Sequence, residues 1–441
     1  MAPRGAGKAR RRHVCSMLLA AVVLVVALGA PAVSRAAGWS RPFRLHGPLS
    51  GDVTSPQLAV SASGQAAVTF ALTDEDRPWA SQAMLVLRSA GGRLSRLTVR
   101  GAKQVLDAAF AGKSLELLTG SGAAGQTCCG AVQAVEVQGT AFASRQTILT
   151  KLTGATVGRL VTLPGRGLLA ALATDRTVWA GQSRPGRRMR PMRRLSGRSS
   201  WPQALDAIGL PRGRDAVVWS GAPGLTESAS NVLIAIGTVK RPPRGPRVAV
   251  NVAAGHAVDG IAVAPNRGAA TVAWIESWFD STGAYQSQVV VVDVTSTLRP
   301  RTFQFPGEIA SGLSLGADAA GEQVLVVRTC DQLGSCRVLA LARSARGQFG
   351  APQALGTIDA SQEPIAAVSA RGAAAIGWVD RGLVVASGRR SALARFAAAR
   401  VVPGPGDAAN LALAFGTGGQ ALAAWVQGTL APSVMGALFA P

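Results

Sequence analysis

Residues 260–277 carry a pattern that recurs along the chain and restricts its possible folds. The stretch holds a short apolar run, a turn with Pro265 and Gly268, and a second apolar run that contains Trp274. Glycine suits the turn because it adopts positive φ without steric cost. Two apolar runs across a tight turn predict a β-hairpin, and their lack of polar alternation predicts strands covered on both faces.

The hairpin pattern occurs eight times, each time with a glycine in the turn and an apolar run after it. The spacings between successive turn glycines lie between 46 and 55 residues. A chain rich in Ala, Val and Gly gives some matches by chance, but the joint recurrence favours a true repeat. A period of about 50 residues is typical of propellers and solenoids, whose units bury their apolar faces against neighbours. The turn glycines are Gly64, Gly112, Gly167, Gly213, Gly268, Gly321, Gly372 and Gly418.

Two further strands follow the hairpin where the pattern is clearest. They are residues 83–87 and 93–99 in the first unit, and 288–294 and 301–305 in the fifth. Four strands in about 50 residues match one blade of a β-propeller. Tryptophans recur in register in the second strands, and we expect them to pack between blades: Trp219, Trp274, Trp378 and Trp425.

The two ends of the repeat region complement each other. The last unit stops after a third strand at 433–439, while residues 42–49 resemble the outer strand expected at 348–355. Pairing the two ends removes an exposed edge and closes the ring. We therefore predict an all-β, single eight-bladed β-propeller in which an N-terminal strand completes the last blade. Seven blades is the alternative, because the third unit is compressed.

Residues 1–36 resemble a signal peptide. A basic start precedes an apolar run at 14–28, which is shorter than the ~20 residues of a membrane span. We predict a signal peptide at 1–36, a propeller domain at 37–441, and a secreted or cell-surface location. An uncleaved anchor is the alternative, and the sequence does not fix the cleavage site.

The chain is strongly basic, with 46 Lys and Arg against 23 Asp and Glu. Much of the excess falls in the outer half of the third unit and in a Pro-rich loop of the fourth. Such a field attracts polyanions such as acidic polysaccharides or anionic lipids, whereas the simpler explanation is an outer strand protected from edge pairing by its charge. Nucleic acid is disfavoured because no aromatic residues interleave for base stacking. The candidate polyanion-binding residues are Arg184, Arg187, Arg188, Arg190, Arg193, Arg194, Lys240, Arg241, Arg244 and Arg247, with Arg198 nearby.

The cysteines indicate an oxidising compartment, because four of them, an even number, follow residue 36. Cys330 and Cys336 flank a short segment between two predicted antiparallel strands, so we predict a disulfide that contributes about 2 kcal/mol. The adjacent Cys128 and Cys129 either form a vicinal disulfide or remain thiols. We predict no metal and no cofactor, since His46 and His256 are far apart in sequence and no Cys-x-x-Cys pair occurs.

Loops between second and third strands carry aromatic and acidic side chains. In propellers these loops lie on the same face as the links between blades. Rings and carboxylates suit carbohydrate or peptide ligands through stacking and hydrogen bonding. Alternatively, Trp79, Trp201 and Trp278 simply cover the ends of blades. The candidate ligand-binding residues are Asp74, Glu75, Asp76, Trp79, Trp201, Glu276, Trp278, Phe279, Asp280 and Tyr285.

No catalytic constellation is evident in the sequence. His256 is the only histidine within the repeats, and neither a G-x-S-x-G elbow nor a phosphate-binding loop occurs. A carboxylate pair drawn from Asp74, Asp76, Glu276 and Asp280 is the remaining route to catalysis.

At the level of architecture, residues 42–441 resemble exported bacterial β-propeller repeat proteins, most clearly at 260–277, 364–380 and 409–427. Neither the Asp-box of sialidase-like propellers nor the WD-type repeat appears, so the resemblance implies a fold without catalytic residues. We expect a monomeric ligand- or protein-binding module or scaffold, with carbohydrate, protein or an anionic envelope polymer as partner. The alternatives are a carbohydrate-active enzyme, a glycoside hydrolase or a lyase, that uses loop-face carboxylates, and a structural envelope protein held through its basic rim.

Overall fold

The computed structural model describes residues 38–441 except 75–79, 122–129, 153–156, 166, 198–200, 223–230, 239, 247, 296–297, 319, 392–393 and 417–418. The predicted signal peptide lies outside this range. Residues Gly38–Pro441 form one unit. Apart from a short 3-10 helix, η2 (Pro211–Gly213), its described regular structure consists of antiparallel strands.

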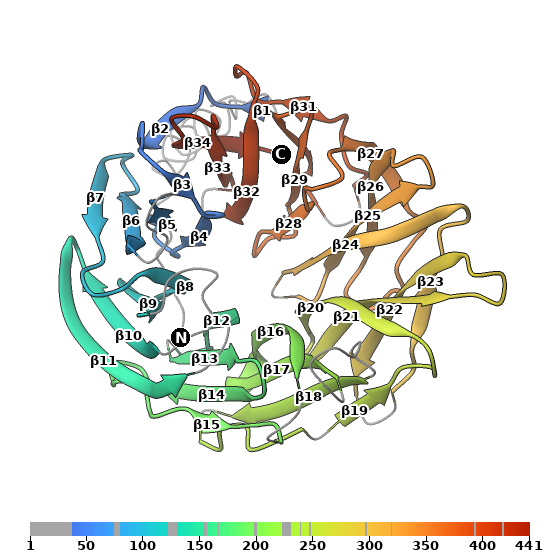
Figure 1. Cartoon of the computed structure of the whole chain (residues 1–441), viewed down its shortest axis with the longest axis horizontal. Helices are drawn as coiled ribbons and strands as arrows, with labels where there is room; N and C mark the ends of the chain where they lie inside the picture. The colour runs from blue at the N-terminus through green and yellow to red at the C-terminus, as the bar shows by residue number, and fades with distance from the viewer. Residues whose placement is uncertain are drawn as a thin grey trace, which may run out of the picture. The chain divides into compact units, whose positions relative to one another are not determined.

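These strands form eight sheets that stand around a ring (Figure 1). Blade one holds β3 (Asp52–Val53), β4 (Gln57–Val60), β5 (Ala66–Thr73), β6 (Gln82–Arg88) and β7 (Leu94–Thr98). Blade two holds β8 (Gln104–Ala111), β9 (Ser114–Gly120), β10 (Gly130–Gln138) and β11 (Ala141–Leu152). Blade three holds β12 (Val157–Thr162), β13 (Leu168–Ala173), β14 (Val178–Ser183) and β15 (Arg193–Arg194). Blade four holds β16 (Pro202–Leu210), β17 (Arg214–Gly221), β18 (Asn231–Thr238) and β19 (Val248–Asn251).

The second half of the ring follows the same order. Blade five holds β20 (Ala257–Asn266), β21 (Ala269–Phe279), β22 (Tyr285–Val294) and β23 (Arg301–Phe303). Blade six holds β24 (Glu308–Ala317), β25 (Gln323–Asp331), β26 (Cys336–Arg343) and β27 (Gln353–Ile358). Blade seven holds β28 (Ile365–Val368), β29 (Ala374–Asp380), β30 (Leu383–Arg389) and β31 (Arg400–Val401). Blade eight holds β32 (Ala408–Phe415), β33 (Ala421–Gln427), β34 (Ser433–Ala440), β1 (Gly38–Trp39) and β2 (Phe43–His46).

The prediction of eight blades is confirmed, and so is closure by the N-terminal strand. Both β1 and β2 pair antiparallel with β34, so two short strands rather than one form the outer edge of blade eight. Leu45 of β2 is fully buried and packs with side chains of blades one and eight. The outer strand therefore joins the two ends of the chain and also fills the seam between the first and last blades.

Most of the predicted turn glycines have the positive φ that the turn requires. Gly268, for example, has φ 92° between β20 and β21. In blade three the prediction was wrong by two residues, because Gly165, with φ 87°, makes the turn. Gly167 is needed for space instead, since a Cβ there would lie 2.7 Å from the carbonyl oxygen of Ser183. Gly418 lies outside the described residues.

Side chains of the second strands alternate between two neighbouring blades, which explains their apolar character on both faces. In β21, Val272 and Trp274 pack against blade four, whereas Ala273 and Ile275 pack against blade six. The expected role of the recurrent tryptophans is confirmed, since each is at most 2% exposed: Trp219, Trp274, Trp378 and Trp425. Burial of apolar surface between wedges holds the ring together.

Polar side chains on the inner strands connect adjacent blades near the centre of the ring. An Asp107 carboxylate oxygen accepts the backbone N–H of Leu160 at 2.7 Å, and Asp206 accepts that of Val263 at 2.9 Å. Arg159 lies between the two and pairs with Asp206 at 3.3 Å. Burial raises the pKa of Asp107 to about 6 in spite of Arg159. These bonds fix the position of each of these first strands relative to the first strand of the next blade.

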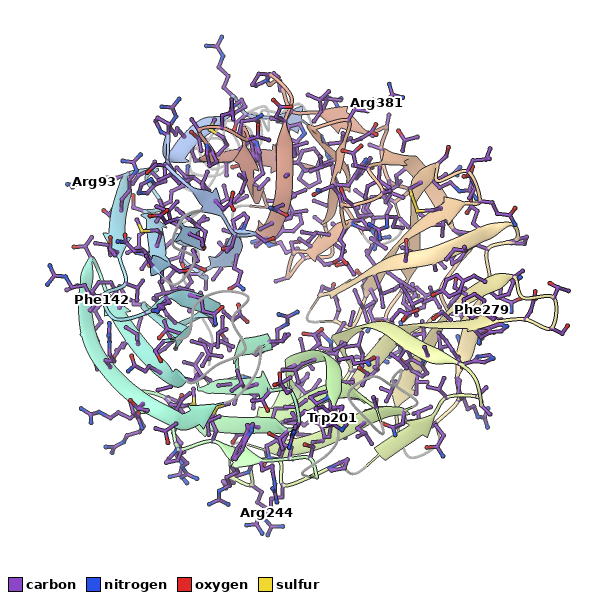
Figure 2. The ribbon with its side chains drawn as sticks, viewed as in Figure 1. Arg93, Phe142, Trp201, Arg244, Phe279 and Arg381 are labelled. Atoms are coloured by element: carbon purple, nitrogen blue, oxygen red, sulfur yellow. A yellow bond between two sulfur atoms is a disulfide. The ribbon has the colours of Figure 1, made fainter. Side chains whose placement is uncertain are left out.

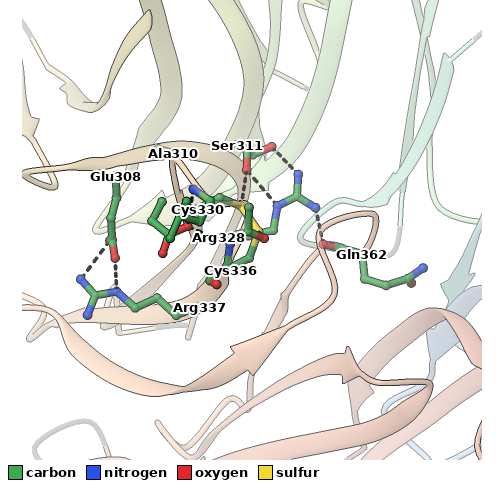
Figure 3. Close-up of a disulfide and its surroundings, with 12 residues drawn as sticks. Glu308, Ala310, Ser311, Arg328, Cys330, Cys336, Arg337 and Gln362 are labelled. Atoms are coloured by element: carbon green, nitrogen blue, oxygen red, sulfur yellow. Dashed lines mark hydrogen bonds and ion pairs between the residues drawn. A yellow bond between two sulfur atoms is a disulfide. The ribbon is translucent and has the colours of Figure 1, made fainter.

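The predicted disulfide between Cys330 and Cys336 is present, and it joins β25 to β26 with a Cα–Cα distance of 4.0 Å (Figure 3). Cys128 and Cys129 lie outside the described residues. Within the described part of the chain, no helix has the length and apolar character needed to cross a membrane.

Candidate functional site

The two faces of the ring are defined by the strand ends that reach them. On one face, which we call the link face, each first strand begins after the link from the preceding blade, and the second strand turns into the third. Register places Ala257 opposite Ser277 and Phe279 opposite Tyr285, so the link and loop of blade five meet there. The other face, which we call the turn face, holds the first-to-second and third-to-fourth connections.

A histidine and a carboxylate meet at the link-face end of blade five. His256 lies in the link before β20, and Glu276 lies near the end of β21. His256 Nδ1 is 2.9 Å from Glu276 Oε1, and the two side chains are 20% and 9% exposed. The imidazole stacks on Trp278 with ring centroids 4.3 Å apart and an interplanar angle of 4°. The ring is thus held by a hydrogen bond at one edge and by an indole across its face.

Further hydrogen bonds fix Glu276. Its Oε2 accepts the side-chain N–H of Gln288 at 3.0 Å, and Gln304 donates to Gln288 at 3.3 Å. An ionised carboxylate only accepts hydrogen bonds, so Nδ1 of a neutral His256 carries the proton. Nε2 is then the basic nitrogen, and no hydrogen-bond partner for it occurs among the described residues. This arrangement can orient a general base.

A second polar group lies on the opposite side of the same sheet. Asp259 Oδ2 accepts hydrogen bonds from the hydroxyls of Ser277 and Tyr285, the latter at 3.1 Å. Burial is the main cause that raises the pKa of Tyr285. Phe279, 71% exposed, meets Tyr285 edge to face with centroids 5.3 Å apart. Phe279 lies toward the outer edge of the ring (Figure 2), so this aromatic pair is available to a ligand from solvent.

Asp280 shapes the loop between β21 and β22. Its carboxylate accepts the N–H groups of Thr282 and Ala284, the Thr282 hydroxyl and the Gln286 amide. The Thr282 hydroxyl and these N–H groups lower the pKa of Asp280 to about 2. Asp280 therefore positions its aromatic neighbours, and its oxygens are already engaged.

The remaining predicted ligand residues lie elsewhere on the link face. Asp74 follows β5 in blade one, across the ring from blade five, so Asp74 and Glu276 do not form a carboxylate pair. Trp201 precedes β16 and lies under the guanidinium of Arg176, 5.0 Å from its ring centroid. Glu75, Asp76 and Trp79 lie outside the described residues. Blade five thus brings together the predicted Glu276, Trp278, Phe279, Asp280 and Tyr285.

Sequence reasoning missed His256 and Asp259 as members of this site. The available signal was their place just before and just after the start of a first strand, which must lie beside the end of the second strand. A register shift between Val258 and Ile261 decides which residues of β21 lie beside His256 and Asp259. The sequence gives no sign of this shift. The described residues contain no group of three or more metal-ligating side chains.

The predicted basic cluster lies on the turn face, opposite the blade-five site, and it extends beyond blades three and four. In the described turn-face segments the acidic residues are Asp318, which is buried, and Glu322, which is partly buried. Arg193 and Arg194 are exposed in β15, while Arg198 and Arg247 are not described. The exposed Lys and Arg of these segments are Arg93, Lys113, Arg184, Arg187, Arg188, Arg190, Arg212, Lys240, Arg241, Arg244, Arg267, Arg299, Arg346, Arg371, Arg390 and Arg395.

No protein-family model and no curated protein matches the chain. Among solved structures, the polysaccharide lyase Uly1 has a TM-score of 0.50 at 8% identity, covering 94% of both chains. A PL25 ulvan lyase bound to -[GlcA(1-4)Rha3S]- has a TM-score of 0.51 at 9% identity. The Dos1 propeller also has 0.51, at 10% identity, and both cover 90% of this chain and 95% of their own. At these identities the likeness shows a shared propeller fold.

Proposed function

We propose that this protein cleaves an acidic polysaccharide by elimination at the link-face end of blade five. The observation that carries the proposal is the His256 ring, which Glu276 and Trp278 hold with Nε2 as its basic nitrogen. Two of the proteins with a similar propeller are polysaccharide lyases, one of them solved with a glucuronate-containing sugar. This supports a uronate polymer as the substrate class.

The chemistry needs a base beside a bound sugar ring. In elimination on a uronate, His256 Nε2 takes the proton from C5 and the electron pair forms a C4–C5 double bond. The glycosidic oxygen then leaves C4 and takes a proton from water. Phe279 and Tyr285 lie on the other side of the sheet from His256, so they offer ring faces to sugars further along the polymer rather than to the reacting unit. Glu276 acts through His256, because it fixes the ring and stabilises the imidazolium that forms.

The described residues favour a lyase over a hydrolase. Hydrolysis by paired carboxylates needs two carboxyl groups roughly 5–9.5 Å apart that flank one bond. At this end of blade five, Glu276 and Asp259 point to opposite sides of the sheet, since successive side chains alternate. Side-chain hydrogen bonds also hold both of them. A single oriented base fits elimination better.

The test is an assay of uronate polysaccharides with the purified protein, in which the ultraviolet absorbance of unsaturated ends reports elimination. We expect His256→Ala to lower the rate about 100-fold or more while polymer binding persists. Phe279→Ala should weaken binding, whereas Phe142→Ala, which removes an exposed ring at the start of β11, should not. If His256→Ala cleaves the polymer at the wild-type rate, or if the products lack the double bond, His256 is not the base of an elimination.

A non-catalytic carbohydrate-binding module is the second candidate. The full hydrogen bonding of Glu276 and Asp280 favours it, because stable polar contacts suit a fixed binding surface. Binding that depends on Phe279 and Trp278, without unsaturated products from any uronate polymer, would select this function. For either function we propose export directed by residues 1–36, which is consistent with the Cys330–Cys336 disulfide.

A further inference from the structure

We propose that the turn face is a second binding surface, which holds an acidic polysaccharide through cationic pockets between blades. The proposal depends on no step of the elimination reaction, because the surface lies on the other side of the ring. Exposed Lys and Arg occur there on seven of the eight blades, whereas the acidic residues of the described turn-face segments are the buried Asp318 and the partly buried Glu322. A one-sided field of this kind concentrates polyanions at the surface.

Two cavities on this face are lined by basic residues and offer discrete sites for anionic groups. The first, about 350 Å³, lies between blades one and two and is lined by Arg88, Arg93 and Lys113 together with Gln65, Ser89 and Thr140. Arg93 and Lys113 are exposed, so their charged ends can converge on a group that enters from solvent. Cationic and amide donors around a cavity of this size suit a carboxylate or a sulfate.

The second cavity, about 450 Å³, lies between blades six and seven and is lined by Arg343, Arg389 and Arg395. Arg343 and Arg389 are only 6% and 3% exposed, and each guanidinium stacks on a phenylalanine, Phe349 and Phe396. Asp293 pairs with Arg343 at 2.8 Å. Burial lowers the pKa of Arg389, an effect that Glu322 and Asp318 oppose. Arg395 is exposed, so this cavity presents a cationic group to an anion that enters from solvent.

Recessed cations favour a flexible polymer over a membrane. The charged groups of a polysaccharide chain can enter cavities, while a flat bilayer meets only the outermost side chains. Among the described residues, Phe142 is the large exposed apolar side chain near this face, so little can insert into lipid. Exposed aromatic residues for base stacking are equally scarce, which disfavours nucleic acid.

The experiment compares two triple variants with the same loss of charge. Arg93→Gln, Lys113→Gln and Arg395→Gln together remove exposed cations from the two cavities. Arg100→Gln, Lys103→Gln and Arg381→Gln together remove three cations from the link face, where Arg100 and Arg381 are exposed and Lys103 is partly buried. Affinity electrophoresis in gels with polygalacturonate, and with neutral dextran as a blank, gives the affinity of each folded variant.

We expect the turn-face triple to bind polygalacturonate about tenfold more weakly, and the link-face triple to stay within about twofold of wild type. Added salt should release the wild-type complex. Equal losses in both triples, or no loss in the turn-face triple, would overturn the proposal. Tighter binding to phosphatidylglycerol vesicles than to polygalacturonate would also overturn it in favour of a membrane. Elimination activity measured alongside, with His256→Ala for comparison, shows whether the blade-five proposal stands or fails separately.

Discussion

At the scale of single residues, blade two contains a carboxylate pair that should make stability depend on pH. Glu116 lies directly opposite Glu136 in the register of β9 and β10. Burial first, and the charge of Glu136 second, raise the pKa of Glu116 from an ordinary value of 4.5 to about 7. The folded chain therefore holds this proton more tightly than the unfolded chain. Its stabilising effect is complete below the ordinary value and is lost as the pH rises through about 7.

Glu116→Gln, which imitates the protonated form, should match wild type in stability at pH 4 and exceed it by ~2 kcal/mol at pH 8. Urea unfolding midpoints measured across this range provide the test. Glu363→Gln is the control, since it removes one negative charge from an exposed link-face position. If the two variants respond to pH in the same way, the pairing with Glu136 has no special effect.

At the scale of elements, the closing strand β2 should contribute far more stability than its four residues suggest. Leu45 is fully buried between blades one and eight, and its carbonyl accepts a hydrogen bond from Arg96 at 2.7 Å. Leu45→Ala would leave a cavity at the seam and should cost about 3 kcal/mol. The shift in the urea midpoint measures this cost. Leu430→Ala, at a side chain 98% exposed, should change little, and comparable effects at both sites would mean that the seam is not critical.

Elements were predictable where local chemistry specifies them. The hairpins, the closing strand and the disulfide between Cys330 and Cys336 each depend on apolar runs, turn glycines or cysteines close to paired strands. The candidate site was only partly predictable. Glu276 and Trp278 could be identified from the sequence, although the structure places them at the end of β21 rather than in the loop, and their contact with His256 depends on a register shift in β20. The basic residues of the turn face are also visible in the sequence. Their location on one face becomes clear only when the structure assigns each loop to a face of the ring.

At the scale of the whole molecule, the two faces of the ring differ in charge. The fully exposed charges of the described turn-face segments are all cationic, and Glu322 is partly buried there. The link-face segments carry Asp74, Asp175, Asp280, Asp359, Glu363 and Asp407 beside a few basic residues. An anionic polymer or bead should therefore meet the molecule in one orientation, with the link face turned away. The blade-five site would then remain open while the protein is held in place.

Lysine acetylation can detect this orientation because the chain has few lysines and they report on different faces. Lys113 and Lys240 are exposed on the turn face, whereas Lys103 lies in a link between blades one and two. In the complex with polygalacturonate, acetylation of Lys113 and Lys240 should fall at least about threefold relative to the free protein, while Lys103 should react as before. Mass spectrometry of the digested protein gives the three rates together. Equal protection of all three lysines would mean that the polymer coats the ring without preference, because a bound turn face cannot shield the opposite side.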